Sequence, residues 1–324
     1  MLAGIKGGCG TVFELTPPKT KGGAWTYEIL YSFQSGKDGY FPWGDLVFDG
    51  AGNLYGATQY GGGFGSCNAP FYQYCGTVFE LSPPKVKGGK WKEKVLYSFK
   101  SGNDGANPNG GLVFDGKGAI YGTTSWGGST TDCVEGGFVG CGTVFKLIAP
   151  GKNGGAWHEK LLHRFKSGTE DGRGPNGGLI FDRRSDLYGT TQSGGKFEDG
   201  VAFRLAPIKG SGQWVEAISY SFQGGIRGWI PEGGLVFDAS GYLYGTTNVA
   251  TTQIQGTVFR LKPPAQGHSS SFATLYGFKG SPDGAQPADD LRFDKVGNLY
   301  GISQAGGTGQ VCQGGCGTVF ELEP

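Results

Sequence analysis

One block of sequence recurs along this chain of 324 residues, and the repetition constrains the fold more than any other feature. The clearest copy spans residues 108–147 and reads PNGGLVFDGKGAIYGTTSWGGSTTDCVEGGFVGCGTVFKL. The copies are spaced by roughly 60 residues, which lies in the range of repeat arrays and propellers. A unit of this kind is usually one supersecondary structure that buries its apolar face against its neighbours.

Each repeat contains four short apolar segments, which in the clearest copy are Leu112–Phe114, Ile120–Thr124, Thr143–Leu147 and Trp157–Phe165. They are rich in Val, Phe, Tyr, Leu and Thr, and Gly, Pro, Asp and Asn separate them. This pattern is typical of β-strands, and no stretch shows a helical period. The first, second and fourth segments occur five times. The third occurs six times, beginning at Thr11, Thr77, Thr143, Val201, Thr257 and Thr318.

These segments predict an all-β fold, a β-propeller of five blades with four antiparallel strands each. The repeat units are residues 46–99, 112–165, 179–222, 235–278, and 291–322 completed by 10–33, so that residues 1–324 form a single domain. We expect Trp25–Phe33 to supply the fourth strand of the last blade, which closes the ring by pairing N- and C-terminal strands. A linear β-solenoid is the alternative, although its coils usually have shorter periods.

The repeated string D-x-x-G-N-L-Y-G-T-T, a Gly-rich loop, G-T-V-F-E-L and L-Y-S-F together resemble the Gloeo/Verruco tandem repeat of secreted, choice-of-anchor bacterial proteins. The resemblance covers essentially the whole chain. It implies a propeller-like, exported and often surface-anchored protein, and it carries over no catalytic residue. The fourth unit departs from the pattern with GVAF at Gly200 and SYSF at Ser219, and the fifth with GISQ after Tyr300.

Composition narrows the possible partners. The formal net charge of +1 argues against electrostatic binding of nucleic acid. No run of 18 apolar residues is present, so the sequence predicts no membrane span. The 66 glycines lack a collagen period and are expected in turns and at close strand contacts.

The seven cysteines follow the repeat. Each of four directly precedes a third strand, and the other three lie upstream in the same loops. We expect three local disulfides, Cys67–Cys75, Cys133–Cys141 and Cys312–Cys316, with Cys9 left unpaired. Buried free thiols are the alternative, and the absence of a CxxC pair argues against zinc. Because disulfides persist outside the cytoplasm, the sequence predicts a secreted or cell-surface protein.

Aromatic residues that the repeat does not explain are candidates for ligand binding. They lie in the loops that lead from a fourth strand to the next first strand, or from a second to a third strand. Exposed aromatic rings can stack on sugars or anchor a protein partner. The alternative is that they pack the loops together. The candidates are Trp43, Trp126, Trp229, Tyr40 and Tyr60, with Phe41 and Phe64 beside them.

Acidic residues offer two further possibilities. Asp45 and Asp290, with Asp289, replace glycines of the repeated Gly-Gly before a first strand, and Glu232 directly precedes that pair; these acids could converge at the propeller axis. Glycoside hydrolysis needs two such carboxylates, but solvated turn residues are the plainer interpretation. A second set recurs before Gly and is interpreted as turns, with calcium as the only possible cofactor: Asp38, Asp104, Asp171 and Asp283.

Another repeated position is structural. Trp25, Trp91, Trp157 and Trp214 begin the fourth segments, with Phe272 as the fifth copy, and are expected to pack between blades. The three histidines form no nucleophile–base pair.

The leading hypothesis is therefore an extracellular binding or scaffold protein that recognises a glycan or a surface protein. The alternatives are a polysaccharide hydrolase and a structural protein that assembles end to end. Self-association is suggested by the sixth copy of the third strand, because GGCGTVFELTP, with Cys9, and GGCGTVFELEP compete for one slot. The other explanation is that the chain is part of a longer repeat protein.

Overall fold

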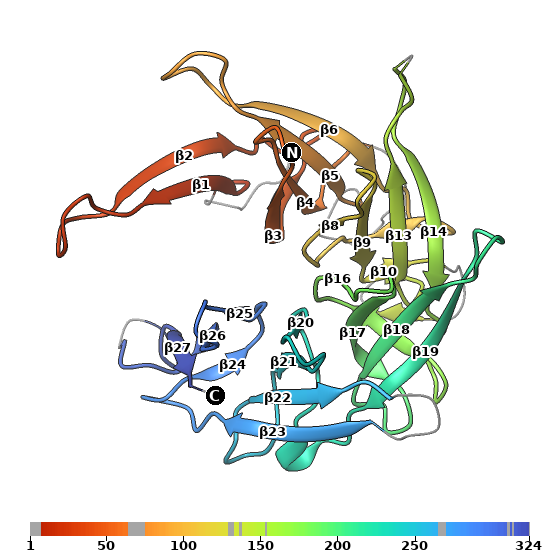
Figure 1. Ribbon diagram of the computed structural model, residues 1–324, viewed down its shortest axis with the longest axis vertical. Coiled ribbons are helices and arrows are strands. Elements are labelled where there is room, and N and C mark those ends of the chain that lie inside the picture. Colours follow the sequence, from red (N-terminus) through yellow and green to blue (C-terminus); the bar gives the residue numbers. More distant parts are fainter. Residues whose placement is uncertain are drawn as a thin grey trace.

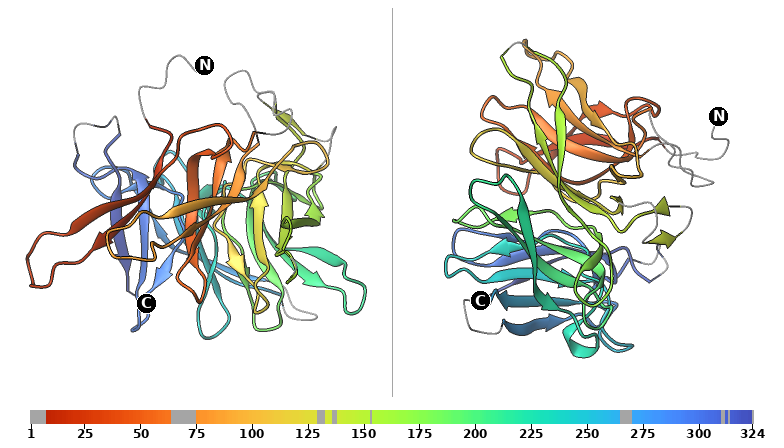
Figure 2. Two further views of the ribbon diagram at one scale, coloured as in Figure 1. Left: turned by 90° about the horizontal axis from the view of Figure 1, so that it is seen from above. Right: turned by 90° about the vertical axis from the view of Figure 1, so that its right-hand side faces the viewer.

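The computed structural model describes residues 8–63, 75–128, 133–135, 138–152, 154–264, 270–309, 312 and 314–323. Five small antiparallel sheets surround a common axis, which confirms the predicted five-bladed propeller (Figure 1). The strands run along that axis, so the loops gather on two opposite faces (Figure 2). None of the helices in the described part of the chain could span a membrane.

Successive strands pair within each blade, with the first strand nearest the axis. Blade one comprises β3 (Tyr40–Phe48), β4 (Leu54–Tyr60), β5 (Thr77–Ser82) and β6 (Lys92–Ser98). Blade two comprises β8 (Val113–Phe114), β9 (Ile120–Thr124), β13 (Thr143–Ile148) and β14 (His158–Arg164), with the short strands β7 (Gly105–Ala106), β10 (Trp126–Gly127), β11 (Val134–Glu135) and β12 (Phe138–Val139) in its loops.

Blade three comprises β15 (Gly172–Pro175), β16 (Ile180–Phe181), β17 (Leu187–Gly194), β18 (Val201–Pro207) and β19 (Trp214–Ser221). Blade four comprises β20 (Val236–Phe237), β21 (Leu243–Thr247), β22 (Thr257–Lys262) and β23 (Ser271–Gly277), preceded by the short 3₁₀ helix η1 (Gly225–Arg227). Blade five comprises β24 (Ala285–Pro287), β25 (Arg292–Phe293), β26 (Leu299–Ala305) and β27 (Thr318–Leu322).

The predicted pairing between the two ends of the chain is wrong. β1 (Thr11–Thr16) and β2 (Thr26–Ser32) form a separate two-stranded sheet, and within the described residues β27 pairs with β26 alone. Each copy of the third strand pairs with a strand close to it in the sequence, β1 with β2 and β27 with β26, so neither copy displaces the other. We call the interval between the β1–β2 hairpin and blade five the seam; the ring of ribbons is interrupted there in Figure 1.

Each third strand packs in two directions. Val78 of β5 faces blade two, whereas the next residue, Phe79, faces the β1–β2 hairpin, and both are fully buried. The phenylalanine after each fourth strand meets the third-strand phenylalanine of the next blade edge-on. The five ring pairs have centroids 5.0–5.2 Å apart: Phe33–Phe79, Phe99–Phe145, Phe165–Phe203, Phe222–Phe259 and Phe278–Phe320. The hairpin therefore docks on blade one with the contact that complete blades use.

A β-bulge interrupts the pairing of third and fourth strands at one repeated point. The register shifts between Val12 and Phe13 in the hairpin and between Val78 and Phe79 in blade one. Blades two, three and four repeat the shift at the equivalent residues. A bulge bends the strand that carries it and increases the local twist.

Repeated polar residues are occupied in building turns. The carboxylate of Asp115 accepts hydrogen bonds from the backbone N–H groups of Lys117 and Ala119 and from the hydroxyl of Tyr121. This arrangement explains why an aspartate ends each first strand and why a tyrosine recurs in the second. In the described part of the chain, no cluster of three or more His, Cys, Asp or Glu side chains is placed to hold a metal ion.

Tryptophans at the start of the fourth strands pack on the preceding blade, as Trp214 does against Tyr121 at 6.2 Å. Trp25 has no blade before it and is 60% exposed. The sequence suggested that Phe272 is the fifth copy of this tryptophan position, and that prediction is wrong. Phe272 pairs with Leu261, whereas Leu147 pairs with Glu159, so Phe272 replaces a glutamate.

Candidate functional site

The first strands begin in van der Waals contact around the axis. A Cβ atom on Gly44, Gly110, Gly177 or Gly233 would overlap the backbone of the next blade, which explains the first glycine of the repeated pair. Blade five carries Asp289 and Asp290 there instead. The carboxylate of Asp290 lies against Gly178, accepts the N–H of Gly234, and has its pKa raised to about 6 by burial.

The other two acids singled out by the sequence also have partners. Asp45 of blade one forms an ion pair with Arg292 of blade five, which joins the two blades near the axis. Glu232 accepts hydrogen bonds from the side-chain amides of Gln192 and Asn248, at 3.0 and 2.8 Å. Burial raises its pKa, and the two amide donors oppose that effect. Each of the three carboxylates therefore forms a contact that links its own blade to a neighbouring blade.

The residues directly before the first position of the repeated Gly-Gly form a set of side chains that we call the mouth ring. It is formed by the residue after the repeated proline in each blade, namely Trp43, Asn109, Asn176, Glu232 and Ala288. The Nδ2 atom of Asn109 donates to the Oδ1 atom of Asn176 at 2.6 Å and to Ser125 Oγ at 2.8 Å. The Oδ1 atom of Asn109 is buried and has no hydrogen-bond partner among the described residues. The Trp43 side chain is 48% exposed.

A pocket of about 330 Å³ opens beside Trp43, and we call it the seam pocket. Its walls are β1, from Thr11 to Phe13, and the segment of β3 from Pro42 to Leu46, and Ala57 and Phe79 complete the lining. In complete blades this space is filled by first and second strands, but β1 pairs with β2 alone. The result is an apolar, aromatic pocket with one carboxylate, Asp45, on its lining.

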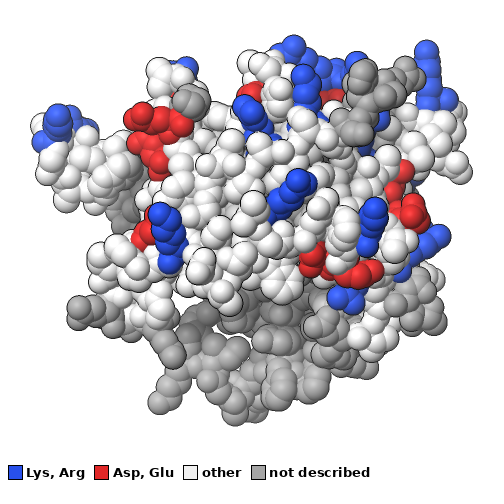
Figure 3. Space-filling model, turned by 90° about the horizontal axis from the view of Figure 1, so that it is seen from below, with Lys and Arg blue, Asp and Glu red and all other residues white. Residues whose placement is uncertain are grey.

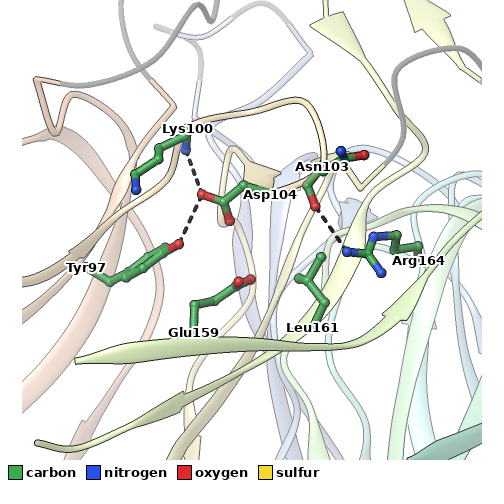
Figure 4. A pocket seen from close by; sticks show the side chains of 7 residues that line it. All are labelled: Tyr97, Lys100, Asn103, Asp104, Glu159, Leu161 and Arg164. Atoms are coloured by element: carbon green, nitrogen blue, oxygen red, sulfur yellow. Dashed lines mark hydrogen bonds between the residues drawn. The ribbon is translucent and has the colours of Figure 1, made fainter. Parts of the chain in front are cut away.

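A second kind of pocket occurs between blades one and two, with a volume of about 420 Å³ (Figure 4). Asp104 accepts hydrogen bonds from the Tyr97 hydroxyl and from the backbone N–H of Lys100. Glu159 approaches from β14 of the next blade, and its Oε1 atom is buried without a hydrogen-bond partner in the described structure. Burial, reinforced by the charge of Asp104, raises the pKa of Glu159 to about 8.

The same acid pair occurs at two other junctions. Burial and a facing aspartate raise the pKa of Glu93, opposite Asp38, to about 7, and that of Glu216, opposite Asp171, to about 8. The next junction lacks both acids. There Phe272 stacks on Tyr220 at 4.4 Å, and Arg227 donates to the Tyr220 hydroxyl. The glutamate and the aspartate thus occur together or not at all at these four junctions.

Sequence reasoning missed these pairs because the two acids belong to consecutive blades. The signal that could have revealed them is that both acids are absent at one junction, where Phe272 replaces the glutamate and Arg227 replaces the aspartate. Asn109 and Asn176 were missed for a similar reason, since each stands alone in its own repeat and only the ring brings them together.

A family model described as the Gloeobacter/Verrucomicrobia repeat matches residues 1–215 and 133–324, which together span the chain. The protein belongs to this repeat family. The resemblance seen in the sequence is thereby confirmed. No curated protein matches the repeat protein.

Solved structures similar to this repeat protein share little sequence with it. A protein of unknown function from Dyadobacter fermentans has 13% identity and a TM-score of 0.48, with 81% of this chain and 74% of that chain covered. An α-L-arabinofuranosidase from Lactobacillus brevis has 10% identity and a TM-score of 0.46, covering 86% and 89%. Trypanosoma rangeli sialidase has 9% identity and a TM-score of 0.48, covering 89% of this chain and 46% of the sialidase.

The aromatic candidates of the Gloeobacter/Verrucomicrobia repeat protein are distributed over several blades. Tyr40, Phe41 and Tyr60 form one cluster in blade one, with ring centroids 5.3–5.9 Å apart. Trp126, in blade two, is half-buried against the core. Trp229 precedes blade four and is more exposed, and it forms a β-bridge with Val249. Phe64 lies outside the described residues.

Two of the expected disulfides are present, Cys133–Cys141 and Cys312–Cys316. The first is buried, whereas both cysteines of the second are exposed. The expected Cys67–Cys75 pair includes residue 67, which lies outside the described residues. Cys9 is a free thiol and is half-buried.

The described residues on the face drawn in Figure 3 form no large patch of charges of one sign. Among the described residues of that face, basic and acidic side chains are scattered singly and in small groups between uncharged residues. This distribution agrees with the formal net charge of +1.

Proposed function

We propose that this repeat protein is an extracellular binding module that recognises a carbohydrate at the mouth of the propeller. The observation that carries the proposal is the exposed indole of Trp43, which belongs to the mouth ring and also lines the seam pocket. An aromatic ring at the edge of a concave site offers a flat apolar surface for stacking, and nearby polar groups fix the orientation of the ligand.

A polar group beside Trp43 suits sugar hydroxyls, because Asp45 offers a carboxylate on the lining of the seam pocket. A sugar hydroxyl can donate to such an acceptor while the C–H face of its ring covers Trp43. In this proposal the loop aromatics Trp126, Trp229 and Tyr60 supply contacts for a longer chain that extends across neighbouring blades. Tyr40, which the sequence also suggested, is buried against Tyr60 and cannot contact a ligand directly.

The disulfides support the proposed location. Bonds such as Cys133–Cys141 form and persist in oxidising compartments and are rare in the cytosol. The proposal of hydrolysis has less support, because Asp45, Glu232 and Asp290 are each engaged by a partner within the ring. Binding requires none of these carboxylates to act as an acid or a nucleophile.

The test is the substitution Trp43→Ala, assayed by polysaccharide pull-down and glycan array. Losing a stacked aromatic costs on the order of 1 kcal/mol, so affinity is expected to fall about fivefold or more. Trp25→Ala is the matched control, because it removes an indole that is at least as exposed but belongs to the outer hairpin. Its binding and the melting temperatures of both variants are expected to match the parent.

A second variant combines Trp43→Ala with Trp126→Ala and Trp229→Ala, and is expected to lose longer glycans first. Carbohydrate recognition at the mouth is excluded if the triple variant binds every glycan as tightly as the parent. It is equally excluded if the parent retains no glycan on the array.

A further inference from the structure

The seam holds two copies of one strand. Residues 9–15 and residues 316–322 both read CGTVFEL. The first copy forms β1 and pairs with β2, and the second forms β27 and pairs with β26. In a complete blade a single strand of this sequence pairs on both sides, with a second strand on one edge and a fourth strand on the other.

Each copy carries out half of the packing of a complete third strand. In β1, Val12 is buried against blade one, but Phe13 is 50% exposed. In β27, Phe320 contacts Phe278 of blade four at 5.0 Å, but Val319 is 79% exposed. A single strand in this position would bury both side chains, as β5 does.

Both halves of the seam already occupy their regular places. The hairpin docks on blade one through Phe33 and Phe79, at the distance that complete blades show. Blade five docks on blade four through Phe278 and Phe320. Near the axis, Arg292 reaches Asp45 across the seam. The edge of β26 that β1 needs is taken by β27.

We propose that the ring closes by strand exchange, in which β1 replaces β27 on β26 and Cys9 replaces Cys316 as the disulfide partner of Cys312. Because the two segments are identical, β1 can adopt the register of β27 without change. Thr11 then lies opposite Ser303, and Phe13 covers Gly301 as Phe320 does now. The blade gains β2 as its fourth strand, and β27 is released.

The covalent step is a thiol–disulfide exchange that needs no added oxidant. The Cys9 thiolate attacks the Sγ atom of Cys312, the Cys9–Cys312 bond forms, and Cys316 leaves as a thiolate. One disulfide is lost and one is formed, and the proton that Cys9 gives up is balanced by the one that Cys316 takes. Cys312 and Cys316 are exposed, so the bond is accessible to attack, unlike the buried Cys133–Cys141 pair.

The experiment uses the full chain, isolated as a monomer and held in a glutathione buffer that permits exchange. Remaining thiols are alkylated, and the protein is digested without reduction for mass spectrometry. We expect a peptide that links Cys9 to Cys312 and an alkylated Cys316. Cys316→Ser is expected to drive this link to completion, whereas Cys9→Ser keeps Cys312–Cys316.

Two substitutions at one strand position provide a matched pair. Phe320→Asp weakens the packing of β27 and is expected to raise the fraction of Cys9–Cys312. Phe13→Asp blocks burial of β1 and is expected to abolish the link, although Phe13 is half exposed in the open ring. Hydrogen exchange supplies an independent readout: on closure, the amides of β1 are expected to slow about tenfold or more while those of β27 become faster.

The inference is overturned if Cys9 and Cys312 both remain alkylatable in folded Cys316→Ser protein while β27 stays protected. It is also overturned if the Cys9–Cys312 link appears only in covalent dimers, since that result assigns the exchange to two copies of the chain. Should Cys316→Ser fail to fold, the hydrogen-exchange pattern of the parent and of Phe13→Asp decides the question.

Discussion

The same five residues, TVFEL, have opposite environments in the interior of the ring and at the seam. At residues 77–81 the valine, phenylalanine and leucine are fully buried. At residues 11–15 the phenylalanine and leucine are about half exposed, and at residues 318–322 the valine is almost fully exposed. The difference arises from the neighbours, since complete blades cover both faces of the strand.

This contrast has an energetic consequence for a repeat protein. Stability in such arrays is approximately the sum of each repeat's own stability and the interfaces with its neighbours. The apolar residues of an interior blade contribute through two interfaces, whereas those at the seam contribute through one. Identical residues are therefore expected to differ widely in their contribution to the free energy of unfolding.

The largest expected effect comes from phenylalanine. Phe145→Ala in blade two removes a fully buried ring and is expected to cost about 3–5 kcal/mol in the free energy of unfolding. Phe13→Ala at the equivalent position of β1 is expected to cost less than about 1 kcal/mol, because half of the ring is already in water. Urea unfolding of both variants measures the two values. Equal costs would show that Phe13 is covered in solution, as it is in the closed ring proposed above.

The disulfides give the next effect in size. Replacing Cys133 and Cys141 by serine opens a loop of eight-residue separation and is expected to cost about 2.5 kcal/mol in the chain-entropy model. The exposed Cys312–Cys316 bond closes a shorter loop and is expected to contribute somewhat less. Under mild reductant, timed alkylation and mass measurement are expected to show Cys312 and Cys316 reacting first. Reduction of the buried pair first would contradict the difference in exposure.

The smallest effect concerns the acid pairs between blades. The pKa of Glu159 is raised to about 8 in the folded protein, so this state binds more protons than the unfolded chain between about pH 4.5 and 8. Stability from this group is fully present below that interval and is lost as the pH rises through it. Glu159→Gln is expected to stabilise by on the order of 1 kcal/mol at pH 9 and by little at pH 5.

Thermal melts at the two pH values measure this difference. Glu170→Gln, an exposed acid in the loop that follows blade two, is the control and is expected to change stability at neither pH. Glu93, in the blade that the hairpin contacts, has a pKa of about 7. The loss of stability from this group is therefore expected to be complete at a lower pH than for Glu159. If the stability difference between Glu159→Gln and the parent were the same at both pH values, the prediction that Glu159 titrates with a raised pKa would be wrong.

Much of the fold could be predicted from the sequence because the repeat states it five times. The spacing of LVFD, LYG and GTVF fixed the strand order, and the positions of the cysteines gave the disulfides at Cys133 and Cys312. The closure of the ring could not be predicted, because two identical strands compete for one place and local sequence favours neither. Which copy pairs with which partner depends on chain connectivity and on docking against blades one and four.

The candidate site was harder to predict than the fold. The sequence drew attention to Trp43 because it breaks the repeat, but not to Asn109, whose role depends on Asn176 in the next blade. Phe272 was aligned with tryptophan by residue type, and only the strand register showed that it replaces a glutamate. Pairs that cross from blade to blade leave no local pattern in the chain.

The bulge repeated between third and fourth strands has a consequence for how these molecules behave when crowded. The outer rim of the ring is made of fourth strands, whose outward edges would otherwise be ready templates for another chain. The bulge bends and twists each of these strands, and lysines such as Lys92 and Lys160 lie along them. In the described structure β27 has no such bulged partner, and β1 is paired on one side alone. In concentrated solution, sheet-to-sheet association is therefore directed to the seam, where both free edges lie, and away from the circumference of the molecule.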